Sequence, residues 1–205
     1  MGKRATEKVE LKEGDALLLV DVQNCFLPGG SLEVPGGDAV ISPLNAAIAV
    51  FTRRGLPVFF SRDWHPADHC SFQEQGGPWP VHCVQDTDGA SFVPNLQRPD
   101  GAAVVSKATV RDKDEYSAMG AKDAEGNTLD KVLRKIGAKR IFAGGLATDY
   151  CVLNTVRDAL GLGYEVCVLV DAIRAVDVNR GDGERAVKEM GERGATMITT
   201  EMLPQ

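Results

Sequence analysis

The sequence predicts a three-layer α/β protein, in which helices cover both faces of a six-stranded parallel sheet. Short apolar segments alternate along the chain with segments of helical spacing, and this βα alternation is typical of a parallel sheet. The apolar segments are hydrophobic almost throughout, as in strands that are buried on both faces. With 205 residues the chain has the size of one domain, and we expect a single domain over residues 1–205.

Six apolar segments are the predicted strands, and they span residues 16–20, 58–60, 102–105, 141–143, 166–170 and 195–198. Four segments suited to helices lie between them, at residues 39–54, 129–136, 149–160 and 183–193. The connections 62–101 and 108–126 are too long to be simple turns. Long ordered loops in a compact domain are usually functional, so these two are expected to carry the site.

Composition excludes several classes of protein. A net charge of −6, with Lys and Arg scattered along the chain, argues against a nucleic-acid partner. No apolar run approaches the roughly 18 residues that span a bilayer, and the polar first residues lack the apolar core of a signal peptide. We therefore expect a soluble cytoplasmic protein that binds neither nucleic acid nor membrane.

The cysteines indicate neither a disulfide framework nor a cysteine-only zinc site, because their number is odd and none has CxxC spacing. Most are expected to be packing residues, as a buried thiol behaves like a small hydrophobic group. The five are Cys25, Cys70, Cys83, Cys151 and Cys167.

Reactive side chains follow four of the predicted strands. Asp21 follows the first strand, Asp63 the second and Lys107 the third, and Cys151 lies in the first turn of the helix after the fourth. Reactive groups of open α/β sheets gather beyond the carboxyl ends of the strands. The four side chains should therefore share one rim of the sheet.

Cys151 is the candidate nucleophile. It lies in a turn of small residues before a helix, with Thr148 as the expected N-cap. The helix dipole and the free N–H groups there should lower the pKa of the thiol and can hold an oxyanion. Taken alone, such a cysteine is more often a buried packing residue. The presence of Asp21 and Lys107 favours the catalytic interpretation.

Asp21 and Lys107 are suited to proton transfer. A carboxylate at the end of an apolar strand is costly to bury without a partner. Asp21 can take the thiol proton and pass it to a leaving group, while Lys107 would keep Asp21 ionised and favour the thiolate. The alternatives are a structural salt bridge or, for Asp21, a cap of the following loop.

All three histidines of the chain lie in the first long loop. Asp63 and His65 are alternate residues of an extended segment, so they point the same way and can chelate one ion. A more distant histidine, His69 or His82, would close the site. Two histidines and a carboxylate with open positions suit one divalent ion, with zinc as our first choice and iron or manganese as alternatives.

Three aromatic residues lie in otherwise polar loops near these groups. Such residues can sandwich a flat ring, although aromatic residues in loops more often cover the edge of a core. They are Phe26, Trp79 and Tyr116.

Together these motifs resemble the isochorismatase-like hydrolase family, in particular its nicotinamidase branch, over almost the whole chain. Residues 21–26 resemble the family's first motif and residues 106–108 its lysine motif. Residues 145–152 resemble its nucleophile turn. The metal loop is matched by residues 62–66, 71–72 and 79–84.

The resemblance implies the isochorismatase-like fold and a catalytic trio of Asp21, Lys107 and Cys151. It also implies a cis peptide before Ala147, which would aim the backbone N–H groups of Ala147 and Cys151 at the substrate carbonyl oxygen as an oxyanion hole. The implied reaction converts nicotinamide to nicotinic acid and ammonia through a thioester, with pyrazinamide as a related amide and NAD salvage as the context.

The resemblance further implies a divalent metal that binds the pyridine nitrogen of the substrate. Phe26 and Trp79 would flank the ring, and Tyr116 would help to close the pocket. His69 aligns with a ligand that only some members use, so it is left out of the expected set, as is Glu74. The implied ligands are Asp63, His65 and His82.

Position 25 departs from the family pattern, because it is Cys where the family more commonly has Asp. Since Cys25 lies one residue from an aromatic wall, we expect it to adjust the pocket. Two other interpretations stay open: an amidase of the same fold that takes carbamoyl or ureido substrates without a metal, and a ligand-binding module without chemistry. The sequence does not define the oligomeric state, and a homo-oligomer is compatible with it.

Overall fold

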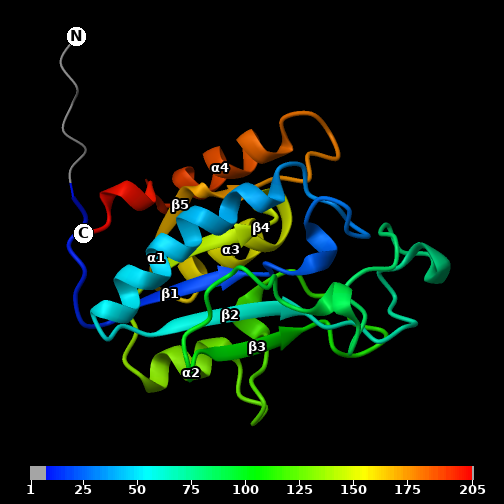
Figure 1. Ribbon diagram of the computed structural model, residues 1–205, viewed down its shortest axis with the longest axis horizontal. Coiled ribbons are helices and arrows are strands. Elements are labelled where there is room, and N and C mark those ends of the chain that lie inside the picture. The colour runs from blue at the N-terminus through cyan, green and yellow to red at the C-terminus, as the bar shows by residue number, and fades with distance from the viewer. Residues whose placement is uncertain (1–7, 205) are drawn as a thin grey trace.

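The computed structural model describes residues 8–204, and in it the six predicted strands form one parallel sheet of order β3-β2-β1-β4-β5-β6 (Figure 1). This confirms the predicted fold class. Several strands run a few residues beyond their apolar segments, because glycine and polar residues at their ends still pair with neighbouring strands. The strands are β1 (Asp15–Val20), β2 (Val58–Asp63), β3 (Ala103–Lys107), β4 (Arg140–Leu146), β5 (Glu165–Arg174) and β6 (Thr196–Ile198).

The four predicted helices are also present. Three of them begin and end within two residues of their predicted bounds: α1 (Ile41–Arg53), α2 (Leu129–Lys135) and α4 (Asp182–Glu192). For the remaining helix, predicted over residues 149–160, the expected start of the α-helix at Asp149 is wrong. Residues Thr148–Val152 form a π-helical turn, in which the Val152 N–H bonds the Ala147 carbonyl, and α3 (Leu153–Gly161) begins only after it. Among residues 8–204, no helix combines the length and the apolar character needed to cross a membrane.

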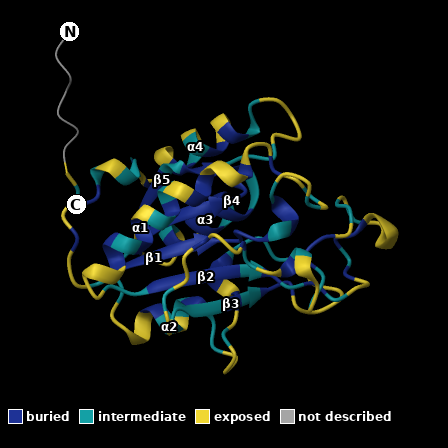
Figure 2. Ribbon diagram, in the orientation of Figure 1, coloured by how far each residue is buried: buried dark blue, intermediate teal, exposed yellow. Residues whose placement is uncertain are grey.

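The sheet is the buried centre of the protein, as the dark strands of Figure 2 show. Successive side chains of a strand point to opposite faces. Leu17 and Leu19 of β1 therefore pack in the same cluster as α1, whereas Leu18 and Val20 pack in the cluster that includes α2, α3 and α4. Burial of both faces explains why the strands are apolar throughout.

The strand order reverses between β1 and β4, since the chain moves from β1 outward to β3 and then returns to β4. Ligands of open parallel sheets bind at such a switch point, beyond the carboxyl ends of the strands. The long loop after β2 lies at this end, where the arrowheads of β1, β2 and β3 point in Figure 1. We call this end the carboxyl rim.

An ion pair between a buried aspartate and a partly buried arginine joins β1 to β4 at the opposite end of the sheet. Asp15 and Arg140 are register partners, and the Arg140 guanidinium donates to both carboxylate oxygens of Asp15, at 2.8 and 2.7 Å. Asp15 is only 1% exposed, and it also accepts a hydrogen bond from the Lys12 N–H. Two parallel hydrogen bonds between planar groups hold the two strands in register.

We predict that Arg140→Met lowers the free energy of unfolding by about 3 to 5 kcal/mol, because it leaves a buried carboxylate without its cation. Lys188→Met is the matched control, since its ion pair with Glu192 is exposed and is worth less than about 1 kcal/mol. Urea denaturation measures both variants. An equally small loss in the two would contradict the structural role of the Asp15 pair.

Candidate active site

Four side chains meet at the carboxyl rim around the amino group of Lys107. Its Nζ lies 3.0 Å from Oδ2 of Asp21 and 3.5 Å from Sγ of Cys151, and it donates to Oδ1 of Asp63. Carboxylate oxygens of the two aspartates and the sulfur of Cys151 lie within 4.8 Å of one another. The structure thus brings together the last residues of β2 and β3, the residue after β1 and the turn after β4.

The backbone turns sharply where β1 ends, and this turn aims Asp21 at the site. Asp21 has a φ of 50°, a left-handed conformation that aspartate tolerates better than most residues. One of its carboxylate oxygens accepts a hydrogen bond of 2.7 Å from the Ser61 hydroxyl. The other is buried and, although ion-paired to Lys107, has no hydrogen bond. This second oxygen is available as a proton acceptor.

Burial and charge oppose each other in this cluster. Burial disfavours the charged form of Lys107, but the carboxylates of Asp21 and Asp63 outweigh it and raise the pKa of Lys107 well above its ordinary value. Burial likewise opposes ionisation of Asp63, but Lys107 outweighs it and lowers the pKa of Asp63. For Asp21, burial prevails over Lys107 and raises the pKa. Lys107 is therefore always charged. Of its two neighbours, Asp63 is ionised, whereas Asp21 binds a proton more readily than an ordinary aspartate.

Cys151 lies in the π-helical turn and not in the first turn of an α-helix, and two expectations about it are wrong. The residue before the turn is Ala147, and the Thr148 side chain makes no capping hydrogen bond. The pKa of Cys151 is raised well above its ordinary value, because burial of the thiol outweighs the effect of Lys107. The structure thus holds a protonated thiol close to a proton acceptor.

The expected cis peptide is present between Leu146 and Ala147, just before this turn. β4 reaches it by passing very close to β1. Gly145 has a φ of 126°, and a Cβ atom there would lie 2.1 Å from the Val20 carbonyl oxygen. Only glycine permits this approach, which places the end of β4 against the residue that precedes Asp21.

Asp63, His65 and His82 form a buried group whose ligand atoms lie within 4.8 Å of one another. The Nδ1 atoms of His65 and His82 face the carbonyl oxygens of Ala108 and Pro80, at 3.3 and 2.8 Å. A carbonyl only accepts hydrogen bonds, so Nδ1 is protonated in both rings and Nε2 carries the free lone pair. Nε2 of His65 is buried, makes no hydrogen bond and lies 3.7 Å from Oδ2 of Asp63. Burial lowers the pKa of His82 to about 4, which keeps its ring neutral.

His69 lies beside this group but is otherwise engaged. Its ring centroid is 4.3 Å from that of His65, yet Nδ1 pairs with the Ser71 hydroxyl at 2.8 Å and Nε2 with the Lys113 carbonyl at 3.0 Å. Both nitrogens therefore have partners. The donor set that remains, two imidazoles and a carboxylate, suits a divalent ion such as zinc.

A small pocket opens between this group and Cys151. Phe26, Trp79 and Tyr116, the three expected aromatic residues, all line it, and the Trp79 indole N–H donates to the Tyr116 hydroxyl at 3.0 Å. The rings of Phe26 and His82 lie 5.8 Å apart. The pocket is lined mostly by apolar and aromatic residues, with Asp63, His82 and Cys151 also on its lining.

Sequence reasoning missed two residues of the site. Tyr150 lines the pocket and packs edge-on against Trp79, with 4.8 Å between ring centroids; its position beside Cys151 was an available signal. Gln23 is fully buried, and its amide makes two 2.8 Å hydrogen bonds with the backbone of Asp63 and one of 2.9 Å with the Ala90 carbonyl. These hydrogen bonds hold the end of β2 in place. No residue spacing in the sequence predicts this role for Gln23.

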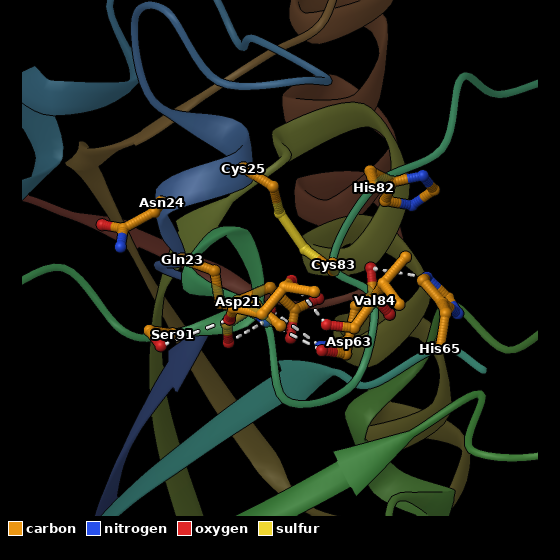
Figure 3. Close-up of a disulfide and its surroundings, with 12 residues drawn as sticks. Asp21, Gln23, Asn24, Cys25, Asp63, His65, His82, Cys83, Val84 and Ser91 are labelled. Carbon is orange, nitrogen blue, oxygen red and sulfur yellow. Dashed lines mark hydrogen bonds and ion pairs between the residues drawn. A yellow bond between two sulfur atoms is a disulfide. The ribbon is translucent and has the colours of Figure 1, made fainter. Parts of the chain in front are cut away.

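Cys25 and Cys83 form a disulfide, with 5.8 Å between their Cα atoms (Figure 3). The expectations of no disulfide and of packing cysteines are therefore wrong for this pair. They lie 58 residues apart, and only the course of the loop after β2 brings them together. Spacing could not reveal this. Cys25 also does not adjust the pocket as a free thiol. Cys70, Cys151 and Cys167 are free.

Comparison with known proteins gives consistent matches over most of the chain. Residues 15–202 match the family model described as the isochorismatase domain. The chain is 42% identical to the nicotinamidase of Escherichia coli over 200 residues, which are 90% of this chain and 94% of that protein.

Two solved structures are also similar. The pyrazinamidase of Pyrococcus horikoshii in complex with zinc is 45% identical, with a TM-score of 0.84 over 91% of this chain and 99% of that one. The protein PnC1 from L. infantum in complex with nicotinate is 35% identical, with a TM-score of 0.86 over 96% and 98% of the two chains. The shared fold extends over nearly the full length of both neighbours.

We predict that His82→Ala and Asp63→Asn each weaken zinc binding by at least about tenfold, because each alters one of the three candidate ligands. His69→Ala is the matched control and should stay within about twofold of wild type, since its nitrogens bond other groups. Competition with a chromophoric chelator measures the three affinities. An equal loss in His69→Ala and His82→Ala would show that the ligand set is wrong.

Proposed function

The chain belongs to the isochorismatase family, and on this premise we propose that it is a metal-containing nicotinamidase, which hydrolyses nicotinamide to nicotinic acid and ammonia. One observation carries the proposal: Cys151, Asp63 and His82 line one small aromatic pocket, with the Asp21 carboxylate beside Cys151 and His65 beside the other two. A nucleophile, a proton carrier and a place for a flat ring are what hydrolysis of a pyridine amide requires.

The pocket supports a flat heteroaromatic amide as substrate. Phe26 and Trp79 provide walls against which a ring can pack, and Tyr116 limits the space beside them. These walls offer few polar groups. The orientation of the substrate ring must therefore come from the metal ligands at one end of the pocket and from the polar groups near Cys151 at the other. Nicotinamide carries its carboxamide meta to the ring nitrogen, so one small ring can present the nitrogen to the metal ligands and the carboxamide to Cys151.

The donor set of Asp63, His65 and His82 fits a divalent cation, with zinc as the first choice. When bound, such a cation supplies a Lewis acid that can hold the pyridine nitrogen and orient the ring. The lone pairs that the two imidazoles present, and the buried Nε2 of His65 without a hydrogen bond, support this assignment.

The reaction then follows from the groups around Lys107. The Cys151 thiol gives its proton to Asp21, and the sulfur attacks the carboxamide carbon to form a tetrahedral adduct. Asp21 returns the proton to the nitrogen, the carbon–nitrogen bond breaks, and ammonia leaves a thioester. Asp21 next takes a proton from water, whose oxygen attacks the thioester, and the sulfur regains a proton as nicotinic acid departs.

Lys107 and two backbone groups stabilise the charges that appear during these steps. The Lys107 ammonium lies 3.5 Å from Sγ of Cys151, so it favours the thiolate once the proton has moved. We assign the oxyanion hole to the backbone N–H groups of Ala147, which precedes the π-helical turn, and of Cys151, which lies in it. Pyrazinamide, which has the same carboxamide on a similar ring, is a second expected substrate.

An amidase of this fold that acts on carbamoyl or ureido substrates is the nearest alternative. Such an enzyme has no use for an aromatic pocket beside a cradle of two histidines and an aspartate. The buried Nε2 of His65 without a hydrogen bond favours the nicotinamidase.

We predict that pure protein loaded with zinc releases ammonia from nicotinamide, and that removing the metal with a chelator lowers the rate at least about tenfold. Restored activity after zinc is added back controls for damage by the chelator. Ammonia release from a ureido or carbamoyl compound but not from nicotinamide, unchanged by chelation, would favour the alternative amidase instead.

We predict that Cys151→Ala lowers kcat for nicotinamide by at least about a thousandfold, because the covalent route is lost. Cys167→Ala, which removes a free thiol of β5, should keep the wild-type rate. Steady-state ammonia release compares the two variants. Normal turnover by Cys151→Ala would refute the thioester route.

A further inference from the structure

We propose that the Cys25–Cys83 disulfide is a positioning element that ties the metal ligands to the wall of the ring pocket. The proposal rests on the proposed function for the roles of His82 and Phe26. Each cysteine is the chain neighbour of one of these residues, since Cys25 precedes Phe26 and Cys83 follows His82. The cross-link therefore joins the two sides of the site (Figure 3).

On the metal side, Cys83 is connected to two ligands. It is covalently adjacent to His82, and its carbonyl oxygen accepts a 3.0 Å hydrogen bond from the His65 N–H. The next residues continue this contact, as His65 and Val84 form a β-bridge and the Gln85 N–H bonds the His65 carbonyl at 2.8 Å. A shift of Cys83 would consequently move both imidazoles.

On the pocket side, Cys25 belongs to the short helical turn Asn24–Phe26. Its carbonyl oxygen accepts a 3.0 Å hydrogen bond from the Leu32 N–H, and Leu32 and Phe26 both line the pocket. The Cys25 backbone is thus part of the wall. Anchoring the side chain of Cys25 anchors that wall.

Few other interactions connect these two segments directly. Within the described part of the chain, no hydrogen bond joins residues 24–26 to residues 82–84. The Phe26 and His82 rings are 5.8 Å apart, a contact that allows sliding. Residues 82–84 belong to the long loop between β2 and β3, whose regular structure is limited to two helical turns of three residues each. The disulfide is the direct covalent link between the two segments, whereas the hydrogen bonds of Asn24 reach the loop farther along, at the Asp88 and Ser91 carbonyls; both cysteines are buried.

Two effects should follow from loss of this link. The metal ligands would have to be ordered when zinc binds, which weakens zinc affinity. The ring wall would be less well placed, which raises KM for nicotinamide while the Cys151 chemistry, and hence kcat, changes little. A disulfide that served stability alone would lower the melting temperature without either effect.

The test compares wild type, Cys25→Ala/Cys83→Ala and the matched control Cys167→Ala. We expect zinc binding about tenfold weaker in the double variant and an altered visible spectrum of its cobalt(II) form. At saturating zinc, its KM should rise severalfold with kcat within about twofold of wild type. Cys167→Ala should match wild type throughout. Zinc affinity and cobalt spectrum equal to wild type in a folded double variant would overturn the proposal.

A second measurement covers a double variant that fails to fold. Wild type is treated with a trialkylphosphine, which takes the disulfide to two thiols and becomes the phosphine oxide with oxygen from water, and the reagent is removed before zinc titration. The same tenfold weakening is expected. Alkylation of denatured protein before reduction should label the three free cysteines, and labelling of all five would overturn the proposal.

The outcome can be separated from that of the proposed function, because zinc affinity and the cobalt spectrum do not depend on the substrate. If wild type left nicotinamide intact, the proposed function would fail and the zinc comparison would still decide the role of the disulfide.

Discussion

The buried ammonium of Lys107 is the interaction on which the site depends. A lysine that is 1% exposed would be very costly without counter-charges, and the carboxylates of Asp21 and Asp63 provide them. The three groups cannot be varied independently. Removing either carboxylate would leave the ammonium under-neutralised, and removing the lysine would leave two carboxylates side by side. Lys107 thus couples the charge of Asp21, which transfers protons, to the charge of Asp63, which belongs to the candidate metal site.

The parallel sheet makes this arrangement possible, and the sequence was sufficient to predict it. Strands buried on both faces are apolar throughout, so segments such as 16–20 and 166–170 stand out without any knowledge of their partners. Because parallel strands end at the same rim, the position of Asp21, Asp63 and Lys107 at strand ends implied that they converge. Local pattern determined these elements, and their bounds differ from the prediction mainly where polar residues continue a strand.

Features that depend on packing were not predictable in this way. The pKa of Cys151 was expected to fall because of the helix start, but the thiol is enclosed and burial prevails. The π-helical turn, the amide contacts of Gln23 and the Cys25–Cys83 link all arise from segments that meet only in the folded chain. His69 shows the same limit, since its chain position suits a ligand while its hydrogen bonds to distant groups decide otherwise.

Gly145 shows how narrowly the backbone itself constrains such a centre. Any side chain at this position would collide with the Val20 carbonyl and force β1 and β4 apart at their carboxyl ends. That displacement would pull Asp21 away from the turn that bears the sulfur, although neither reactive group had been altered. Substitutions that change substrate preference are therefore expected in the surrounding loops, whereas the close approach of β1 and β4 requires glycine at position 145.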